Sequence, residues 1–216
     1  MGNLDYQLFY RRHLPHYQPP GATVFITFRL AGSLPVEIIK RLMDEAARID
    51  CNLEKITDHA ARTQRAYLEH KRMFSKWDAA LDAVTAGPHW LRDSQIAEIV
   101  AEGLHYRDGR VYTLDGYSLM PNHVHVVFTP LKKNDAEYHP LSGIMHSLKR
   151  HTAQAANAQL RRTGEFWQHE NYDHVVRDEP EYRRILRYVL NNPVKAGLTS
   201  TSDSWKWNYC RFGKTL

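Results

Sequence analysis

The sequence predicts an α+β fold, in which helices pack against an antiparallel sheet. Runs rich in β-branched and aromatic residues at 23–29, 111–120 and 123–129 indicate strands. The segments between and after these runs place apolar residues at helical spacing. With 216 residues, of which 43% are hydrophobic, the chain can build one core. We therefore expect a single domain over residues 1–216.

The N-terminal half begins with a strand and continues with helices. The strand at 23–29 is bounded by Gly21 and Gly32, which favour turns. Three helices are expected next, at residues 35–49, 58–83 and 93–104. They predict a helical insertion or a long crossover over residues 31–110, between the first and second strands.

The C-terminal half contains the remaining strands. We expect an antiparallel strand pair joined by Pro121 and Asn122, a helix, a strand and a closing helix, at residues 111–120 with 123–129, 141–160, 166–177 and 179–191. Asn192 and Pro193 are expected to end the closing helix. The order fits a ferredoxin-like βαββαβ sheet with helices on one face and an added C-terminal helix.

Composition narrows the class of partner and the compartment. The chain has 29 Lys and Arg against 24 Asp and Glu, and the resulting net charge of +5 favours a polyanion such as nucleic acid. Cys51 and Cys210 are too few for a disulfide framework or a cysteine zinc site, which fits a reducing cytoplasm. No run approaches the roughly 18 apolar residues of a membrane span. We expect a cytoplasmic protein that does not bind membranes.

Two histidines begin the third predicted strand. His123 and His125 are two residues apart, so their side chains leave the same face of the sheet. Val124, Val126 and Phe128 form the opposite, apolar face. The spacing alone fits a solvated histidine pair as well as a metal site. Their position directly after the Pro-Asn turn favours a shared metal ion.

A tyrosine on the closing helix is the candidate nucleophile. Tyr188 points about 110° away from the apolar stripe of that helix, and Asn192 lies beside it one turn later. Considered alone, Tyr188 also fits an amphipathic residue at the core boundary. A phenol needs help to attack a phosphodiester, and a metal held by the two histidines and Asn192 could supply it. This mixed nitrogen and oxygen set suits Mn²⁺ or Mg²⁺ and does not select zinc.

Three blocks resemble a known family over nearly the whole chain. They are RRHLPHYQPPGATVFITFRL at 11–30, MPNHVHVVF at 120–128 and FWQHENYDHVVRDEPEYRRILRYVLNNPVKAGL at 166–198. In this order they resemble the REP-associated tyrosine transposases, which are single-tyrosine members of the HUH endonuclease superfamily. The resemblance implies a catalytic domain that binds a DNA hairpin and cuts an adjoining single strand. The reaction that the resemblance implies forms a 5′-phosphotyrosine and frees a 3′-hydroxyl.

The resemblance also implies roles for individual residues. His123 and His125 match the metal-binding pair, Tyr188 matches the nucleophile, and Asn192 matches the residue that completes the metal site. Tyr172 and Tyr182 are weaker candidates for the nucleophile. Because residues 31–110 look longer than in the shortest relatives, no role for that segment carries over.

The predicted partner is single-stranded or hairpin DNA, bound by a monomer or a homodimer. Basic residues would contact phosphates and an aromatic residue would stack on bases. The candidates are Arg11, Arg12, Lys149, Arg150, Trp167, Arg177, Arg184 and Lys195. Two alternatives stay open: a domesticated module that binds hairpins without cutting, and a metal phosphodiesterase that uses water in place of tyrosine.

Overall fold

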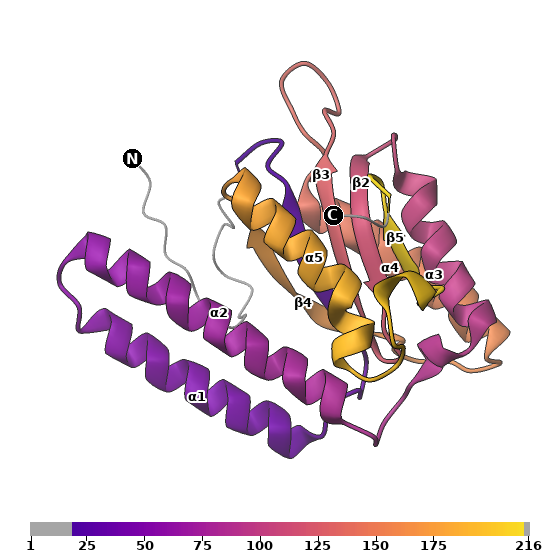
Figure 1. Cartoon of the computed structure of the whole chain (residues 1–216), viewed down its shortest axis with the longest axis horizontal. Helices are drawn as coiled ribbons and strands as arrows, with labels where there is room; N and C mark the ends of the chain where they lie inside the picture. Colours follow the sequence, from indigo (N-terminus) through magenta and orange to yellow (C-terminus); the bar gives the residue numbers. More distant parts are fainter. Residues whose placement is uncertain (1–18, 214–216) are drawn as a thin grey trace. The chain divides into compact units, whose positions relative to one another are not determined.

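The computed structural model describes residues 19–213, and these form two compact units (Figure 1). The first unit, Leu34–Gly87, is called the helical hairpin below. The second comprises residues 19–33 and 88–213 and is called the sheet unit. The single domain expected over residues 1–216 stays a prediction.

A five-stranded antiparallel sheet forms the centre of the sheet unit. Its strands are β1 (Val24–Leu30), β2 (Tyr112–Leu119), β3 (His123–Pro130), β4 (Trp167–Val175) and β5 (Asn208–Cys210). Their order is β4-β1-β3-β2-β5. The first four strands therefore have the ferredoxin-like order 4-1-3-2, and the predicted α+β class is confirmed. The strand β5 was not predicted from the sequence, because three residues are too short to show alternation.

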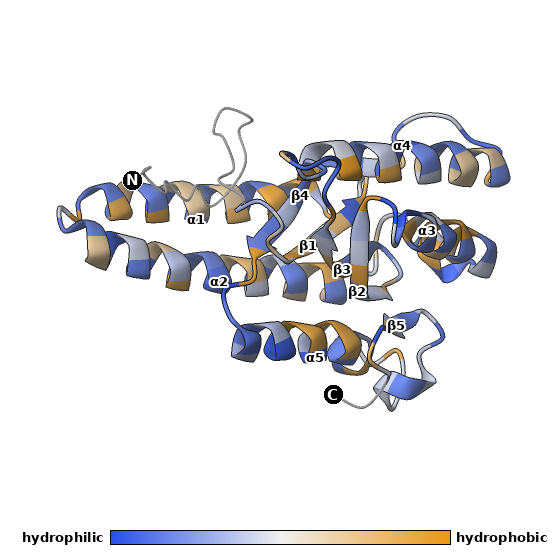
Figure 2. Cartoon of the chain, turned by 90° about the horizontal axis from the view of Figure 1, so that it is seen from above, coloured by the Kyte–Doolittle hydropathy of each residue, from blue (hydrophilic) through white to orange (hydrophobic). Residues whose placement is uncertain are grey.

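Helices cover both faces of this sheet (Figure 2). The helices α3 (Ser94–Arg107) and α4 (Leu141–Gln159) lie on one face, and α5 (Glu179–Lys195) lies on the other. The hydrophobic core contains Ile26, Val126, Leu104 and Leu148, which are fully buried. Because strand side chains alternate, the intervening residues of β1 and β3 point toward α5.

The close approach of α5 to the sheet depends on a glycine. A Cβ atom on Gly116 of β2 would lie 3.1 Å from Leu186 Cδ2 and 3.0 Å from the carbonyl oxygen of Tyr209. Both contacts are tighter than a side chain normally accepts. Gly116 therefore lets α5 and β5 pack together against β2. The pairing of β2 with β3 shifts register between Leu114 and Gly116, which leaves Asp115 in a bulge.

The expected end of the closing helix at Asn192 and Pro193 is wrong. The helix α5 runs through Pro193 to Lys195. Because proline has no backbone N–H, Pro193 removes one main-chain hydrogen bond from the last turn of α5. The turn is closed by the Ala196 N–H, which donates to the Asn192 carbonyl (2.9 Å), and by the Leu198 N–H, which donates to the Pro193 carbonyl (2.9 Å). Asn192 therefore keeps regular helical geometry one turn after Tyr188.

The helical hairpin consists of α1 (Val36–Glu54) and α2 (His59–Ala83). These helices bury a core of their own, to which Leu42, Ile49 and Met73 contribute. Asp58 caps α2, since its carboxylate accepts the Ala61 N–H at 2.9 Å. The helix α1 extends five residues beyond the expected 35–49, because Ile49 and Leu53 continue its buried face.

The insertion expected over residues 31–110 divides between the two units. Residues 34–87 form the hairpin, whereas α3 packs against α4 and β2 as part of the sheet unit. Between them lies the short 3₁₀ helix η1 (Trp90–Arg92), and a second one, η2 (Ser202–Ser204), precedes β5. Within residues 19–213, none of the helices combines the length and apolar character that crossing a membrane requires.

Candidate metal and nucleophile site

A row of polar side chains crosses the sheet face that α5 covers. Residues directly opposite each other in a ladder share one face of the sheet. The cross-strand partners, from one edge to the other, are Tyr172, Thr27, His125, Ser118 and Asn208. In the parallel row toward the start of β3, Arg29 lies opposite His123. The histidine pair therefore occupies the middle strand of the sheet.

The two predicted histidines face each other through their Nε2 atoms. His123 Nε2 lies 3.0 Å from His125 Nε2, and the ring centroids are 4.6 Å apart with nearly perpendicular planes. Both side chains are buried, at 1% and 0% exposure. Burial matters here because a buried pair of ring nitrogens needs a proton or a cation between them.

Two further side chains orient the imidazoles from behind. Asn122 Oδ1 lies 2.7 Å from His123 Nδ1, and Thr27 Oγ1 lies 2.7 Å from His125 Nδ1. Where these oxygens accept Nδ1–H bonds, each Nε2 keeps its lone pair. Two lone pairs 3.0 Å apart repel each other, and a shared cation would relieve that repulsion.

The helix α5 brings the candidate phenol and amide to the same place. Asn192 Nδ2 lies 2.9 Å from His125 Nε2. The Tyr188 ring centroid lies 5.7 Å from that of His125, in an edge-on arrangement. Phe25 of β1 packs against both rings, with centroids 5.8 Å from His125 and 6.1 Å from Tyr188. The structure thus places all four predicted site residues beside one another.

The residues present fit a divalent metal ion. Asn192 Oδ1 is buried and has no hydrogen-bond partner among the residues that the structure describes. Turning the amide over would put this oxygen where Nδ2 stands, 2.9 Å from His125 Nε2. Neighbouring ligand atoms about 2.1 Å from one ion are separated by about 3 Å. Two imidazole nitrogens and one amide oxygen therefore match a partial coordination shell with room for substrate oxygens.

The start of α5 is attached to the edge strand β4. His174 Nε2 lies 3.3 Å from Glu181 Oε1, and Glu181 is only 3% exposed. The second oxygen of this carboxylate accepts the Arg177 N–H at 3.1 Å. Asp178 caps the helix through the Glu181 N–H (2.7 Å). Since Glu181 and Tyr188 are two turns apart on one face, this attachment also orients the phenol.

The rival tyrosines have different surroundings. The Tyr182 hydroxyl donates to the carboxylate of Asp115, and burial raises the pKa of that phenol. Burial also raises the pKa of Asp115 to about 6, although hydrogen bonds from Tyr182 and Thr129 oppose the change. Tyr172 packs edge-on against Phe25 at 6.0 Å. No ring contact joins Tyr182 to the histidine pair among the contacts of residues 19–213.

Two of the residues predicted to bind DNA have contacts inside the fold. The Lys149 ammonium donates to the carbonyl oxygens of Gln168 (2.9 Å), His169 (3.1 Å) and Glu170 (3.4 Å) and to Asn171 Oδ1 (2.6 Å). Burial lowers its pKa to about 7, and Arg29 adds to that effect. Trp167 is 6% exposed, and its indole N–H donates to Thr152 Oγ1 at 2.9 Å.

The other predicted DNA contacts lie at the surface or outside the described chain. Arg150, Arg177, Arg184 and Lys195 are exposed. The Lys195 ammonium lies 5.8 Å from the centroid of the Tyr188 ring. Arg11 and Arg12 lie outside the residues that the structure describes.

Three residues at this site were missed from the sequence. Thr27 and Asn122 hold the imidazoles, and Arg29 lies opposite His123. Asn122 could have been found, because it directly precedes the histidine pair. Thr27 and Arg29 show no local signal, since only the register of β1 against β3 brings them there.

These features define the class as a ferredoxin-like α+β protein whose central strand and added helix bring two histidines, an asparagine and a tyrosine together. Searched against family models, the chain matches none. It is similar to REP-associated tyrosine transposases in both sequence and fold.

The relatives by sequence come from two bacteria. The REP-associated tyrosine transposase of Escherichia coli strain K12 is 23% identical, over 46% of this chain and 54% of that protein. A putative REP-associated tyrosine transposase of Haemophilus influenzae is 26% identical, over 42% and 54%. An uncharacterized protein of the same species is 27% identical, over 38% and 54%. The chain thus spans about half the length of the curated relatives it matches.

The fold is similar to that of a solved REP-associated tyrosine transposase bound to a REP hairpin. The TM-score is 0.55 with 14% sequence identity, and the match covers 92% of this chain and 82% of that one. Fold and sequence similarity together support the resemblance drawn from the three sequence blocks.

Proposed function

We propose that this protein is a metal-dependent DNA strand transferase that cuts a single strand beside a DNA hairpin, with Tyr188 as the nucleophile. The observation that carries the proposal is the convergence of Tyr188, His125 and His123. The centroid of the Tyr188 ring lies 5.7 Å from that of His125. His125 Nε2 lies 3.0 Å from His123 Nε2. The names of the relatives support the same activity and a hairpin substrate.

Each residue has a role in the proposed reaction. The Tyr188 oxygen attacks the phosphorus, and the bond from phosphorus to the 3′ oxygen breaks. The phenol loses its proton to water, and the departing 3′ oxygen gains one, which leaves a 5′-phosphotyrosine and a free 3′-hydroxyl. Lys195 favours the phenolate. A divalent ion, Mg²⁺ or Mn²⁺, held by His123, His125 and Asn192 would neutralise and orient the phosphate.

The exposed cations are proposed to hold the DNA. Arg150, Arg177, Arg184 and Lys195 offer phosphate contacts from the surface of the sheet unit. Arg11, Arg12, Lys149 and Trp167 keep their predicted DNA-binding roles, although the internal contacts of Lys149 and Trp167 compete with those roles.

Replacing Tyr188 by Phe tests the nucleophile. The purified protein is incubated with Mn²⁺ or Mg²⁺ and hairpin oligonucleotides that carry single-stranded extensions. A covalent protein–DNA adduct that survives denaturation is expected for the wild type. Its yield should fall about a thousandfold or more in Tyr188→Phe, because phenylalanine has no hydroxyl oxygen to form the bond to phosphorus. Hairpin binding should remain close to that of the wild type.

Three controls separate the alternatives. Tyr172→Phe and Tyr182→Phe should keep the adduct, and a chelator should abolish it. Unchanged adduct yield in Tyr188→Phe rules out the assignment. Cleavage that leaves no protein on the DNA points to a phosphodiesterase that uses water. Tight, metal-independent hairpin binding without any cutting points to a domesticated binding module.

A further inference from the structure

We infer that the outer surface of α5 binds the phosphodiester backbone of single-stranded DNA and leads that strand to Tyr188. This α5 outer surface is defined by Arg184, Arg187, Asn191 and Lys195, all of which are exposed. The inference rests on the proposed function for its direction, since it assumes that Tyr188 is where the strand is cut.

Helical geometry places these four residues on one side of Tyr188. At 100° per residue they fall within about 80° of one another, and Lys195 and Arg184 lie nearest to the tyrosine. On the other side of Tyr188, Glu181 and Asn192 are buried against the sheet. Tyr188 is half-buried and therefore marks the line where the outer surface meets the site. A strand lying along this surface would pass the Tyr188 side chain, whose hydroxyl oxygen is itself buried.

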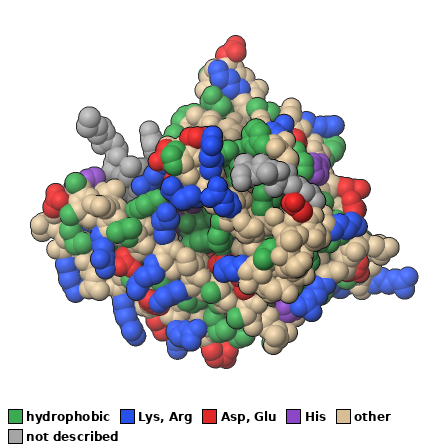
Figure 3. Space-filling view, in the orientation of Figure 1, with side chains coloured by type: hydrophobic (Ala, Val, Ile, Leu, Met, Phe, Trp, Pro, Cys, Tyr) green, Lys and Arg blue, Asp and Glu red, His purple; other side chains and the backbone are tan. Residues whose placement is uncertain are grey.

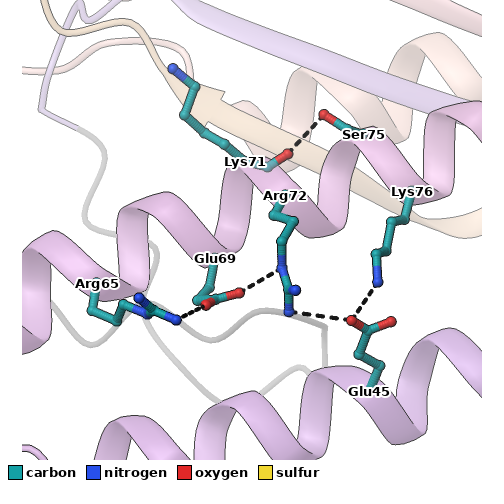
Figure 4. Close-up of polar contacts among 7 residues, drawn as sticks. All are labelled: Glu45, Arg65, Glu69, Lys71, Arg72, Ser75 and Lys76. Atoms are coloured by element: carbon teal, nitrogen blue, oxygen red, sulfur yellow. Dashed lines mark hydrogen bonds and ion pairs between the residues drawn. The ribbon is translucent and has the colours of Figure 1, made fainter.

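The cations of this surface differ from three cations of the helical hairpin, Arg65, Arg72 and Lys76. On the hairpin, the carboxylate of Glu69 binds Arg65 and Arg72, and that of Glu45 binds Arg72 and Lys76 (Figure 4). These helical cations are therefore neutralised by neighbouring carboxylates. Such pairs leave little charge for an external anion.

On α5 the neutralising carboxylates are few. Arg183 Nε lies 2.8 Å from Glu179 Oε1. Arg184 and Arg187 form no ion pair with any residue in the described part of the chain. Figure 3 shows Lys and Arg side chains gathered over the upper part of α5. Exposed, unpaired guanidinium groups are the side chains that best bind phosphate. The unpaired charge therefore points to a polyanionic ligand.

The position of Tyr188 favours a single strand as that ligand. The ring of Tyr188 packs against Phe25 and His125, so the phenol lies at the border between α5 and the sheet. A single strand can bend into that border. A duplex cannot do so as easily, because its second backbone would have to bend with the first. From Arg184 to Lys195 the surface is about 16 Å long at 1.5 Å per residue, enough for several contacts to one strand.

The test measures the salt dependence of binding by Arg184→Gln/Arg187→Gln. The probe is fluorescent oligothymidylate of about 20 nucleotides, and a chelator prevents cutting. Dissociation constants are measured from about 50 to 200 mM salt. Each phosphate contact to a single strand adds about 0.7 to the slope of log K against log salt. The double variant should therefore lose about 1.4 from the slope, while its melting temperature stays that of the wild type.

A matched variant removes the same charge elsewhere. Lys132 and Lys133 are exposed in the loop between β3 and α4, so Lys132→Gln/Lys133→Gln changes the net charge equally. This variant should keep the wild-type slope on oligothymidylate. An equal loss of slope in both variants would mean that the change in net charge alone weakens binding, and it would overturn the inference. An unchanged slope in the α5 variant, or an equal loss on a blunt duplex of the same length, would also overturn it.

The inference and the proposed function fail in different assays. Binding without metal requires no chemistry, so a wild type that forms no adduct could still show the slope change of the α5 variant. In that case the proposed function fails and the single-strand surface stands. If the wild type forms the adduct but the α5 variant keeps the wild-type slope, the proposed function stands and the single-strand surface fails.

Discussion

At the scale of single residues, His125 is held by contacts from three elements. Thr27 of β1 bonds its Nδ1, while His123 of β3 and Asn192 of α5 approach its Nε2. Each contact restricts the orientation of the imidazole ring, so the Nε2 atoms of both histidines converge before substrate binds. Such preorganisation lowers the free energy of assembling a metal and phosphate site.

Asp115 gives a prediction about stability and pH. Burial raises the pKa of its carboxyl to about 6 in the folded protein, above the ordinary value of 3.8. The folded state thus holds this proton more tightly than the unfolded state. The resulting stabilisation is complete below pH 3.8 and is lost as the pH rises through about 6.

Asp115→Asn cannot ionise and should therefore be more stable than the wild type at pH 8, by at most about 3 kcal/mol. At pH 4 the two proteins should differ much less. Urea unfolding from pH 4 to pH 8 measures both free energies of unfolding. A difference that is the same at both ends of this range would contradict the assigned pKa.

At the scale of elements, one ammonium group forms several of the hydrogen bonds between α4 and β4. Lys149 of α4 donates to the carbonyl oxygens of Gln168, His169 and Glu170 and to Asn171 Oδ1. These oxygens lie where β1 and β4 shift register, between Phe28 and Leu30 of β1. A bulge leaves ladder groups unpaired, and a cation with several donors can satisfy them.

Lys149→Met should lower the free energy of unfolding by about 2–4 kcal/mol, because it leaves several partly buried oxygens without a donor. Chemical denaturation provides the measurement. The adjacent Arg150 is exposed, and Arg150→Met should change stability by less than about 0.5 kcal/mol. Similar effects of the two substitutions would show that Lys149 does not stabilise β4.

At the scale of the whole molecule, the helical hairpin is an inserted unit with its own core. Leu42, Ile49 and Met73 are buried within it, and Glu45 and Glu69 link its charged residues. The chain leaves the sheet unit and returns to it at neighbouring points, because a Cβ on Gly32 would lie 3.9 Å from Pro88 Cδ. Closing such a short gap costs little loop entropy.

Replacing Leu34–Gly87 by a short Gly-Ser linker should therefore leave the sheet unit folded. The shortened protein is expected to unfold cooperatively and to show a dispersed amide spectrum by NMR. Circular dichroism should report the loss of the two helices and no loss of strand. A molten or aggregated product would show that the sheet unit needs the hairpin in order to fold.

Local sequence patterns determined much of the fold and the chemistry of the candidate site. Alternation placed His123 and His125 on one face, and helical spacing separated Tyr188 from the buried stripe of α5. Each of these inferences depends on neighbours within about two turns or one strand, which a single sequence displays.

Only the tertiary structure decided which distant groups meet. Asn192 and His125 are 67 residues apart, and Thr27 and His125 are 98 apart. The strand register that pairs Thr27 with His125 depends on every contact along β1 and β3 together, which no local pattern encodes. The short strand β5 likewise depends on its pairing with β2. The last turn of α5, through Pro193, is closed by the hydrogen bonds from Ala196 and Leu198, and these contacts outweigh local propensity.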